Sequence, residues 1–306
     1  IANFIGCDPD EIVFTSGATE ANNLAIKGLR TANTSFGNRT KILVSAIEHK
    51  CVLESANYLE RQFGLSVQQI PVDNNGYLNA ETIPSDSLLT LQIVNGETGA
   101  VQDIEAIKTK AEMVVLDATY SGPRIALGEN WDGAIFSPHA WGGPAGLSIF
   151  AIANPQQWRY PLPHIAPIRT PGGSSLPLLL GAAVALENFK EDSAKISSLD
   201  HYLRTQISES IPAAIVGGEN SQSMPNYQTI VIPGTISEML VRELEANAIS
   251  VDAGSACSPA DLTPSHVLAA MGLPTEGSIR LTLREDHTEA DIDALVKALV
   301  EVCRNF

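Results

Sequence analysis

The chain has 306 residues, 44% of them hydrophobic, which suffices for one large domain or two unequal ones and excludes a disordered protein. Its 19 basic and 35 acidic residues give a net charge of -16, which argues against nucleic acid or an anionic membrane as a partner. Because no apolar run approaches the roughly 18 residues of a membrane span and no signal peptide is evident, we expect a cytoplasmic protein.

Short apolar and β-branched runs alternate with amphipathic stretches through the first two thirds of the chain. They predict strands at residues 11–15, 41–45, 88–94, 113–117 and 133–136, mostly separated by helices. This rhythm predicts an α/β fold, a mostly parallel sheet flanked by helices. Ligands of such sheets bind beyond the carboxyl ends of the strands, where the polar motifs of this chain fall.

The pattern changes in the last third of the chain. An apolar helix at 176–188 is followed by strands at 230–232 and 279–283, a helix near 237–248 and a final helix from Glu289. We therefore predict a large domain at 1–189 and a smaller α+β domain at 190–306. The cysteines show no CxxC spacing, which predicts neither a disulfide framework nor a metal site; they are Cys7, Cys51, Cys257 and Cys303.

Two motifs follow predicted strands with groups suited to a phosphate. Ser-Gly-Ala-Thr-Glu at 16–20 joins a strand to a helix whose first amides and Thr19 hydroxyl can hold an anion, although an ordinary helix start has the same pattern. In Ser-Pro-His-Ala at 137–140, the Ser137 hydroxyl and His139 imidazole can also bind phosphate. Ala140 stands where a lysine of such a motif would form a Schiff base.

Two further strand ends carry ionisable side chains. The His49 imidazole can stack on a pyridine ring and exchange protons near neutral pH, although a helix cap is the plainer role. Asp117 ends an apolar strand, where a carboxylate is costly unless it meets a cation such as a protonated pyridine nitrogen. Capping of the following turn is the alternative for Asp117.

These motifs together resemble the cysteine desulfurases, fold type I pyridoxal-phosphate enzymes of the class V aminotransferase group. The resemblance runs collinearly along the chain. It also includes Asn-Gly-Glu-Thr-Gly at 95–99 and Ala-Gly-Ser-Ala-Cys at 253–257. It implies pyridoxal 5'-phosphate as the cofactor, L-cysteine as the substrate, a homodimer and a sulfur-acceptor protein as a partner.

The resemblance also implies a role for each matching residue. The cofactor phosphate is expected at Ala18, Thr19, Ser137 and His139, while His49 stacks on the ring and acts as acid and base. Asp117 pairs with the ring nitrogen.

The remaining matches concern the cofactor ring, the substrate and its sulfur. The resemblance implies that Asn95 and Tyr120 border the cofactor and that Asn95 and Arg280 bind the substrate. It also implies that Cys257 takes the sulfur as a persulfide while alanine is released. The small residues around Cys257 predict a mobile loop, although an isolated free cysteine is more often a packing residue.

Several positions depart from the family pattern. Tyr120 replaces the usual glutamine, Gly96 replaces a second asparagine, and Arg284 with Glu285 replaces a Gly-Arg pair. In the family a partner subunit contacts the phosphate through an Arg-x-Gly-Thr motif, and residues 169–173 match this motif only in part. The chain also begins within what resembles the family's first large helix, so we expect a segment bordering the active site to be absent.

Ala140 admits three explanations: an engineered lysine replacement, a natural loss, or a lysine supplied from elsewhere, for which Lys50 is the nearest by sequence. Without the amine, the cofactor can bind non-covalently or as a trapped aldimine, and turnover should fall severely. The first hypothesis is therefore a catalytically impaired desulfurase. The alternatives are a non-catalytic cofactor-binding or sulfur-transfer scaffold and, more weakly, an aminotransferase-type or selenocysteine lyase activity.

Overall fold

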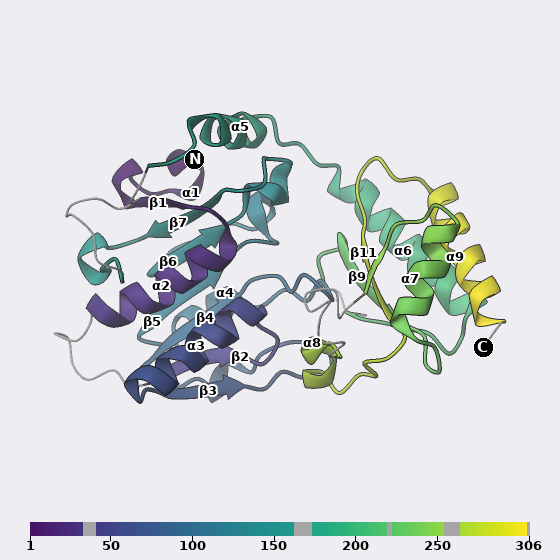
Figure 1. Cartoon of the computed structure of the whole chain (residues 1–306), viewed down its shortest axis with the longest axis horizontal. Helices are drawn as coiled ribbons and strands as arrows, with labels where there is room; N and C mark the ends of the chain where they lie inside the picture. Colours follow the sequence, from purple (N-terminus) through teal and green to yellow (C-terminus); the bar gives the residue numbers. More distant parts are fainter. Residues whose placement is uncertain (33–40, 162–172, 219–221, 254–263, 305–306) are drawn as a thin grey trace. The chain divides into compact units, whose positions relative to one another are not determined.

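The computed structural model describes residues 1–32, 41–161, 173–218, 222–253 and 264–304 (Figure 1). Contacts divide the chain into two compact units. Unit 1 comprises Ile1–Pro71, Leu78–Ile93 and Gln102–Phe189, and unit 2 comprises Val72–Tyr77, Val94–Val101 and Lys190–Phe306. Two short segments that precede residue 190 in the sequence thus belong to unit 2. No helix within the described ranges is long and apolar enough to cross a membrane.

Unit 1 is built on a seven-stranded sheet in the order β1-β7-β6-β5-β4-β2-β3. All neighbours pair in parallel except β7, which is antiparallel to both β1 and β6, so the predicted mostly parallel sheet is confirmed. The strands are β1 (Ile12–Thr15), β2 (Lys41–Ser45), β3 (Ser66–Ile70), β4 (Ser87–Gln92), β5 (Met113–Asp117), β6 (Gly133–Phe136) and β7 (Ser148–Ile152).

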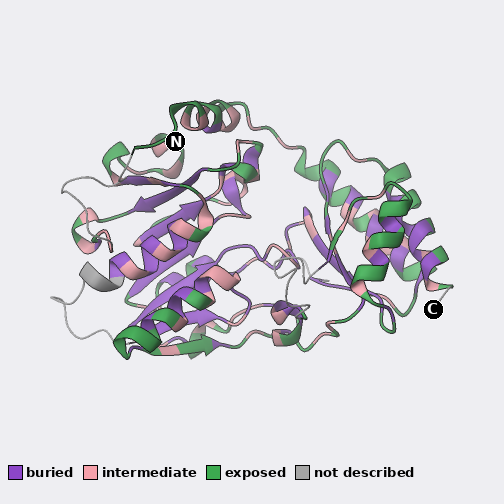
Figure 2. Cartoon of the chain, in the orientation of Figure 1, coloured by how far each residue is buried: buried purple, intermediate pink, exposed green. Residues whose placement is uncertain are grey.

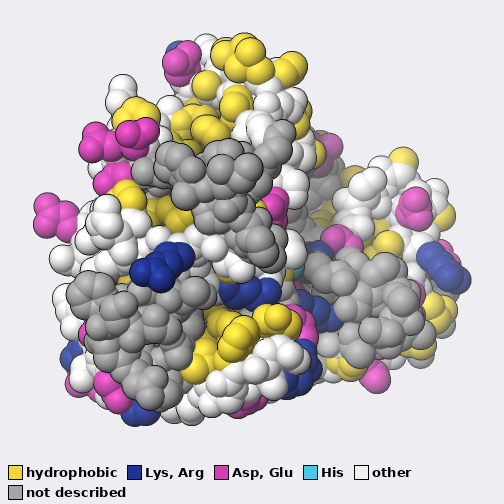
Figure 3. Space-filling view, turned by 60° about the vertical axis from the view of Figure 1, so that its left-hand side comes forward, with side chains coloured by type: hydrophobic (Ala, Val, Ile, Leu, Met, Phe, Trp, Pro, Cys, Tyr) yellow, Lys and Arg dark blue, Asp and Glu magenta, His cyan; other side chains and the backbone are white. Residues whose placement is uncertain are grey.

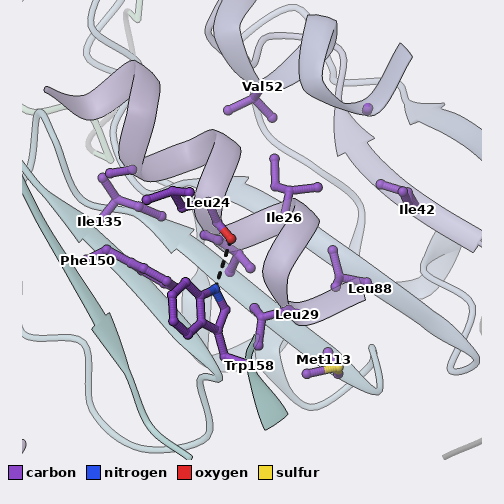
Figure 4. Packing of buried hydrophobic residues seen from close by; sticks show 14 of the residues in the cluster. Leu24, Ile26, Leu29, Ile42, Val52, Leu88, Met113, Ile135, Phe150 and Trp158 are labelled. Carbon is purple, nitrogen blue, oxygen red and sulfur yellow. Dashed lines mark hydrogen bonds between the residues drawn. The ribbon is translucent and has the colours of Figure 1, made fainter. Parts of the chain in front are cut away.

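Helices α2 (Ala18–Ala32) and α3 (Lys50–Phe63) lie side by side across one face of this sheet (Figure 1). Their apolar sides bury Ile26, Leu29 and Val52 in one core cluster that also contains Phe150 of β7 (Figure 4). The Trp158 indole donates to the Leu24 carbonyl at 2.9 Å and fixes α2 to the segment that follows β7. The other helices of unit 1 are α1 (Ala2–Ile5), α4 (Ile104–Lys108) and α5 (Leu176–Glu187).

Close packing of α2 on Trp158 depends on a glycine. A Cβ atom at Gly28 would lie 2.0 Å from the Trp158 Nε1 and 2.6 Å from the Arg159 carbonyl oxygen. Real Cβ atoms do not approach other atoms so closely, so any larger residue at Gly28 would push the indole out of its place. A glycine inside a helix lowers helix stability, and this close contact explains why α2 has one at position 28.

Unit 2 contains a four-stranded antiparallel sheet in the order β10-β11-β9-β8. Its strands are β8 (Ile215–Val216), β9 (Tyr227–Val231), β10 (Asp252–Ala253) and β11 (Ser278–Thr282). Its helices are α6 (Ser193–Ser210), α7 (Ser237–Ala246), α8 (His266–Ala270) and α9 (Glu289–Cys303). Residues of α6, α7 and α9 pack on one face of the sheet around Leu203 and Leu299, both fully buried. Figure 2 shows that the strands are mostly buried and that the outer sides of these helices are exposed.

Candidate functional site

The first turn of α2 lies directly beyond the carboxyl end of β1. Gly17 precedes the helix and offers no side chain to cap its first amides, which a helix leaves without intrahelical partners. The Ser16 amide and hydroxyl instead both donate to one carboxylate oxygen of Glu20, each at 2.7 Å. Ala18 is half-buried and the Thr19 side chain is exposed. The amides and the hydroxyl thus form a place that suits an anion.

Asp117 ends β5 and is only 2% exposed. Its Oδ1 accepts from the Thr119 amide at 2.9 Å and from the Thr119 hydroxyl at 2.6 Å. Its Oδ2 accepts from the Asn22 Nδ2 at 2.9 Å, and the same amide group donates to the Ala18 carbonyl at 3.1 Å. Three donors suit an ionised carboxylate, and Asn22 joins that carboxylate to the first turn of α2.

His49 occupies the N-cap position of α3. Its Nδ1 accepts from the Cys51 amide at 3.2 Å, so the proton of the neutral ring lies on Nε2. The Cys51 side chain forms a hydrogen bond with Thr19. Burial, followed by the charge of Asp117, raises the pKa of the Cys51 thiol to about 12. Cys51 therefore stays protonated at neutral pH and links the first turns of α2 and α3 without acting as a nucleophile.

Glu48 precedes the histidine and is fully buried. Its Oε1 accepts from the Gln92 amide at 2.6 Å, and Gln92 lies opposite Asp117 in the pairing of β4 with β5. Burial is the main cause that raises the pKa of Glu48 well above its usual range, and the negative charge of Asp117 raises it further. The site thus contains two buried carboxyl groups of different character, and the environment of Glu48 favours its protonated form.

The turn after β6 carries the third group of predicted residues. Ser137 begins a short 3-10 helix (Pro138–Trp141), in which His139 is exposed and Ala140 is half-buried. β6 pairs with β5 so that Ile135 lies opposite Asp117, and Ser137 follows two residues later on the same edge of the sheet. Strand pairing therefore brings this turn and Asp117 to neighbouring positions, as the sequence predicted.

Ala140 is held between its neighbours by backbone and side-chain contacts. The Arg124 Nη1 donates to the Ala140 carbonyl at 2.9 Å. A Cβ atom at Gly122 would lie 2.8 Å from the Ala140 Cβ, and Gly122 has a positive φ of 49°. Gly122 therefore lies close against the Ala140 side chain, and a larger residue at position 122 would clash with it. Tyr120, in the same connection from β5, is half-buried.

Two predicted residues belong to unit 2. Asn95 is buried, and its Oδ1 accepts from the amides of Glu97 and Thr98 at 2.9 and 3.0 Å, which closes a turn. Arg280 lies in the middle of β11 with a half-buried side chain. The remaining candidates, Cys257 and the phosphate contact at 169–172, lie outside the described residues.

The geometry of unit 1 fits a ligand with an anionic end and a cationic ring. The first turn of α2 supplies donors for an anion, and buried Asp117 supplies a negative charge for a cation. The buried Asn22 Oδ1 lacks a hydrogen-bond partner within the part of the chain that is described, and so does the Ser121 Oγ. Across the same residues, no group of three or more His, Cys, Asp or Glu side chains could hold a metal ion.

Comparison with known proteins decides the family. The profile of the Aminotransferase class-V family matches residues 1–163 and 177–295. The chain belongs to this family. It is similar to cysteine desulfurase IscS of Clostridium botulinum, with 32% identity over 99% of the chain and 82% of the relative. It is equally similar, at 32% identity over 98% of its length, to a mitochondrial cysteine desulfurase of Arthroderma benhamiae, of which it spans 64%.

The class-V fold is also evident from solved structures. A NifS-like protein superimposes with a TM-score of 0.84 at 27% identity, over 100% of this chain and 85% of that protein. The predicted resemblance to the cysteine desulfurases and the predicted fold type are therefore confirmed. Class-V enzymes of this group depend on pyridoxal phosphate. A phosphorylated pyridine is the kind of ligand that the donors of α2 and the carboxylate of Asp117 fit.

Several residues of this site make contacts that the sequence motifs alone do not specify. Asn22 and Glu48 stand inside recognisable motifs, but their long-range bonds to Asp117 and Gln92 are visible only in the fold. In the sequence Cys51 is one of the scattered cysteines, whereas in the structure it connects the first turns of two helices. A polar residue inside a motif that also borders a buried strand end is the one signal that could have indicated Asn22 and Glu48.

Proposed function

We propose that the protein binds pyridoxal phosphate non-covalently together with an α-amino acid such as L-cysteine. In this proposal it has the scaffold of a cysteine desulfurase, and its parent reaction is impaired at Ala140. The observation that carries the proposal is a contrast within one edge of the sheet. The buried Asp117 carboxylate accepts from three donors, while position 140 in the adjacent turn offers a methyl group in place of an amine.

Each described residue has a defined task in this proposal. The α2 amides at Ala18 and Thr19, with Ser137 and His139, hold the phosphate. The remaining tasks concern the ring. Asp117 holds the cationic ring nitrogen, and hydrogen bonds from Asn22 and Thr119 fix the orientation of the carboxylate.

His49 lies over the ring in this proposal, and its Nε2 carries the proton that it can donate. The bond from the Cys51 amide to Nδ1 fixes the plane of the imidazole. Bound pyridoxal phosphate would supply the electron sink for chemistry at the amino-acid carbon. Asn95 and Tyr120 border that ring, Arg280 binds the substrate carboxylate with its planar fork, and Cys257 accepts the sulfur.

Restoring the amine tests the proposal. The Ala140→Lys variant should gain an absorbance band near about 420 nm, typical of this cofactor when it is bound to lysine. With dithiothreitol added to reduce the persulfide, it should also release sulfide from L-cysteine. The native chain should bind the cofactor without that band. Ala140→Arg is the matched control, because it adds length and charge but no primary amine. A lysine variant with neither band nor sulfide would contradict the proposal.

The second candidate function is a non-catalytic homologue that acts as a cofactor-binding or sulfur-transfer scaffold. Ala140 itself favours it, together with Tyr120 in place of the family's glutamine. In that case Ala140→Lys gains no activity, whereas the native chain still binds the cofactor or a sulfur-acceptor protein. A third and weaker candidate is selenocysteine cleavage or an aminotransferase-type reaction. It would be favoured if Cys257→Ala, made in the Ala140→Lys background, kept full activity.

The proposal includes a homodimer, and α5 supports it. This helix is almost wholly apolar, yet Ala182 alone among its residues is buried, and Leu176, Leu180 and Val184 are 63%, 58% and 57% exposed. Figure 3 shows hydrophobic side chains gathered at the top of the view, where Figure 1 places α5. Contiguous exposed apolar surface marks an interface in soluble proteins.

Sedimentation velocity tests the dimer. Leu180→Glu should convert the dimer to a monomer, because a buried charge at an apolar interface is costly. Phe63→Glu on α3, a side chain that is 65% exposed, is the control and should leave the dimer intact. An unchanged sedimentation coefficient for Leu180→Glu would show that α5 does not form the interface.

A further inference from the structure

Arg280 lies on the face of the unit 2 sheet that is opposite to its apolar core. Its neighbours on β11, Ile279 and Leu281, are buried in that core at 0% and 9% exposure. Side chains alternate along a strand, so Arg280 faces the other side of the sheet. Its side chain is 15% exposed, which leaves the guanidinium largely shielded from water.

Asp252 on β10 stands directly across from Arg280 in the antiparallel register. The Arg280 Nη2 donates to the Asp252 Oδ2, and the two form an ion pair. The pair is unequal, because the Asp252 side chain is 55% exposed while the guanidinium is shielded. Asp252 can return to water at little cost, whereas a shielded guanidinium requires an acceptor.

The same face of the sheet carries the turn of Asn95. Thr229 of β9 lies opposite Arg280 on its other side, and the Thr229 hydroxyl donates to the Glu97 carbonyl at 2.6 Å. The Glu97 amide in turn donates to the Asn95 Oδ1 at 2.9 Å. The two proposed substrate-binding residues, Asn95 and Arg280, are therefore joined to one face of the sheet through Thr229.

We propose that Asp252 is an internal competitor for Arg280, a built-in carboxylate that occupies the guanidinium until the carboxylate of an amino acid replaces it. The inference rests on the proposed function, in which Arg280 binds that carboxylate. A ligand with a carboxylate exchanges one charge-assisted bond for another and gives Asp252 back to water. A ligand without a carboxylate gains nothing from Arg280, so Asp252 lowers the affinity for amino acids and leaves the affinity for simple amines unchanged.

Two probes that differ only in the amino-acid part measure this exchange. Phosphopyridoxyl-L-alanine, the stable amine formed when borohydride reduces the Schiff base of pyridoxal phosphate with L-alanine, carries the carboxylate, and pyridoxamine 5'-phosphate does not. By calorimetric titration at about 0.15 M ionic strength, which screens distant charges, Asp252→Asn should tighten binding of phosphopyridoxyl-L-alanine about two- to fivefold. Binding of pyridoxamine 5'-phosphate should not change.

Control variants separate the exchange from a general charge effect. Asp286→Asn removes the same charge from the exposed pair of Arg284 with Asp286 and should change neither affinity. Arg280→Gln should abolish the preference for phosphopyridoxyl-L-alanine. If Asp252→Asn weakens that probe, or tightens both probes equally, the inference is overturned, because Asp252 then supports Arg280 or acts at long range.

A second measurement does not depend on the cofactor. The NMR signal of the Arg280 Nε–H is followed while L-alanine is added, and the half-saturation concentration should fall about two- to fivefold in Asp252→Asn. An unchanged half-saturation concentration overturns the inference even where the phosphorylated probes bind. Failure of pyridoxamine 5'-phosphate to bind the native chain would instead count against the proposed function alone.

Discussion

The two units hold their proposed ligand-binding groups in different ways. In unit 1 the carboxylate of Asp117 lies at a strand end, is 2% exposed and accepts three hydrogen bonds. In unit 2 the guanidinium of Arg280 lies in mid-strand and pairs with a carboxylate that is 55% exposed. The first arrangement is fixed and the second is exchangeable.

The largest expected effect compares the two cores. Phe150→Ala should lower the free energy of unfolding of unit 1 by about 3–5 kcal/mol, because Phe150 is fully buried and packs edge-on against Trp158. Leu203→Ala should lower that of unit 2 by about 2–5 kcal/mol. Differential scanning calorimetry should show a separate transition moving in each variant. One shared transition that moves in both would show that the units unfold together.

The next effect concerns the fixed carboxylate. Asp117→Asn should weaken binding of pyridoxamine 5'-phosphate roughly 100-fold, because it leaves the cationic ring without its partner and turns two amide groups toward each other at Asn22. Asp86→Asn is the control, since that side chain is 68% exposed and pairs with Lys41 at the surface. Equal affinities of the native chain and Asp117→Asn in calorimetric titration would show that Asp117 does not meet the ring.

The smallest effect is the pH dependence that Glu48 causes. Its pKa is raised above the usual 4.5, so the folded state binds this proton more tightly than the unfolded chain does. Its contribution to stability is full below pH 4.5 and is lost as the pH rises toward the folded value. Glu48→Gln keeps the acceptor for Gln92 and should remove a decline of up to about 1.4 kcal/mol per pH unit.

Urea unfolding at several pH values between 4.5 and 7 measures this decline. Asp200→Asn in unit 2 sharpens the comparison, because burial raises the pKa of Asp200 but the charge of Arg204 opposes the shift. It should therefore alter the pH dependence less than Glu48→Gln does. Parallel curves for the native chain and Glu48→Gln would show that Glu48 is ionised in the fold.

Much of the fold follows from local patterns in the sequence. The strands β2, β5 and β6 begin and end where their apolar runs do. Strand β3 was not predicted, because its residues Ser66–Ile70 are mostly exposed at the edge of the sheet and include two glutamines. Strand β7 was also missed, because it runs antiparallel without the preceding helix that the β-α rhythm requires.

For the candidate site, too, local sequence patterns predict some features and not others. His49, Asp117 and Ser137 could be expected at one edge because parallel strands end together there. The bonds that give these groups their character connect distant residues, such as Asn22 with Asp117 and Glu48 with Gln92, and no local pattern specifies them. The pairing of Asp252 with Arg280 likewise depends on the register of two strands that are far apart in sequence.

The contact of Trp158 with α2 gives the molecule a built-in optical label. All three tryptophans of the chain, Trp131, Trp141 and Trp158, fall in unit 1, and the indoles of Trp141 and Trp158 are buried and hydrogen-bonded. Tryptophan fluorescence excited at the red edge of protein absorbance therefore reports on unit 1, and unit 2 contributes no tryptophan emission. A ligand or a substitution that alters this emission has acted on the seven-stranded sheet and its covering helices.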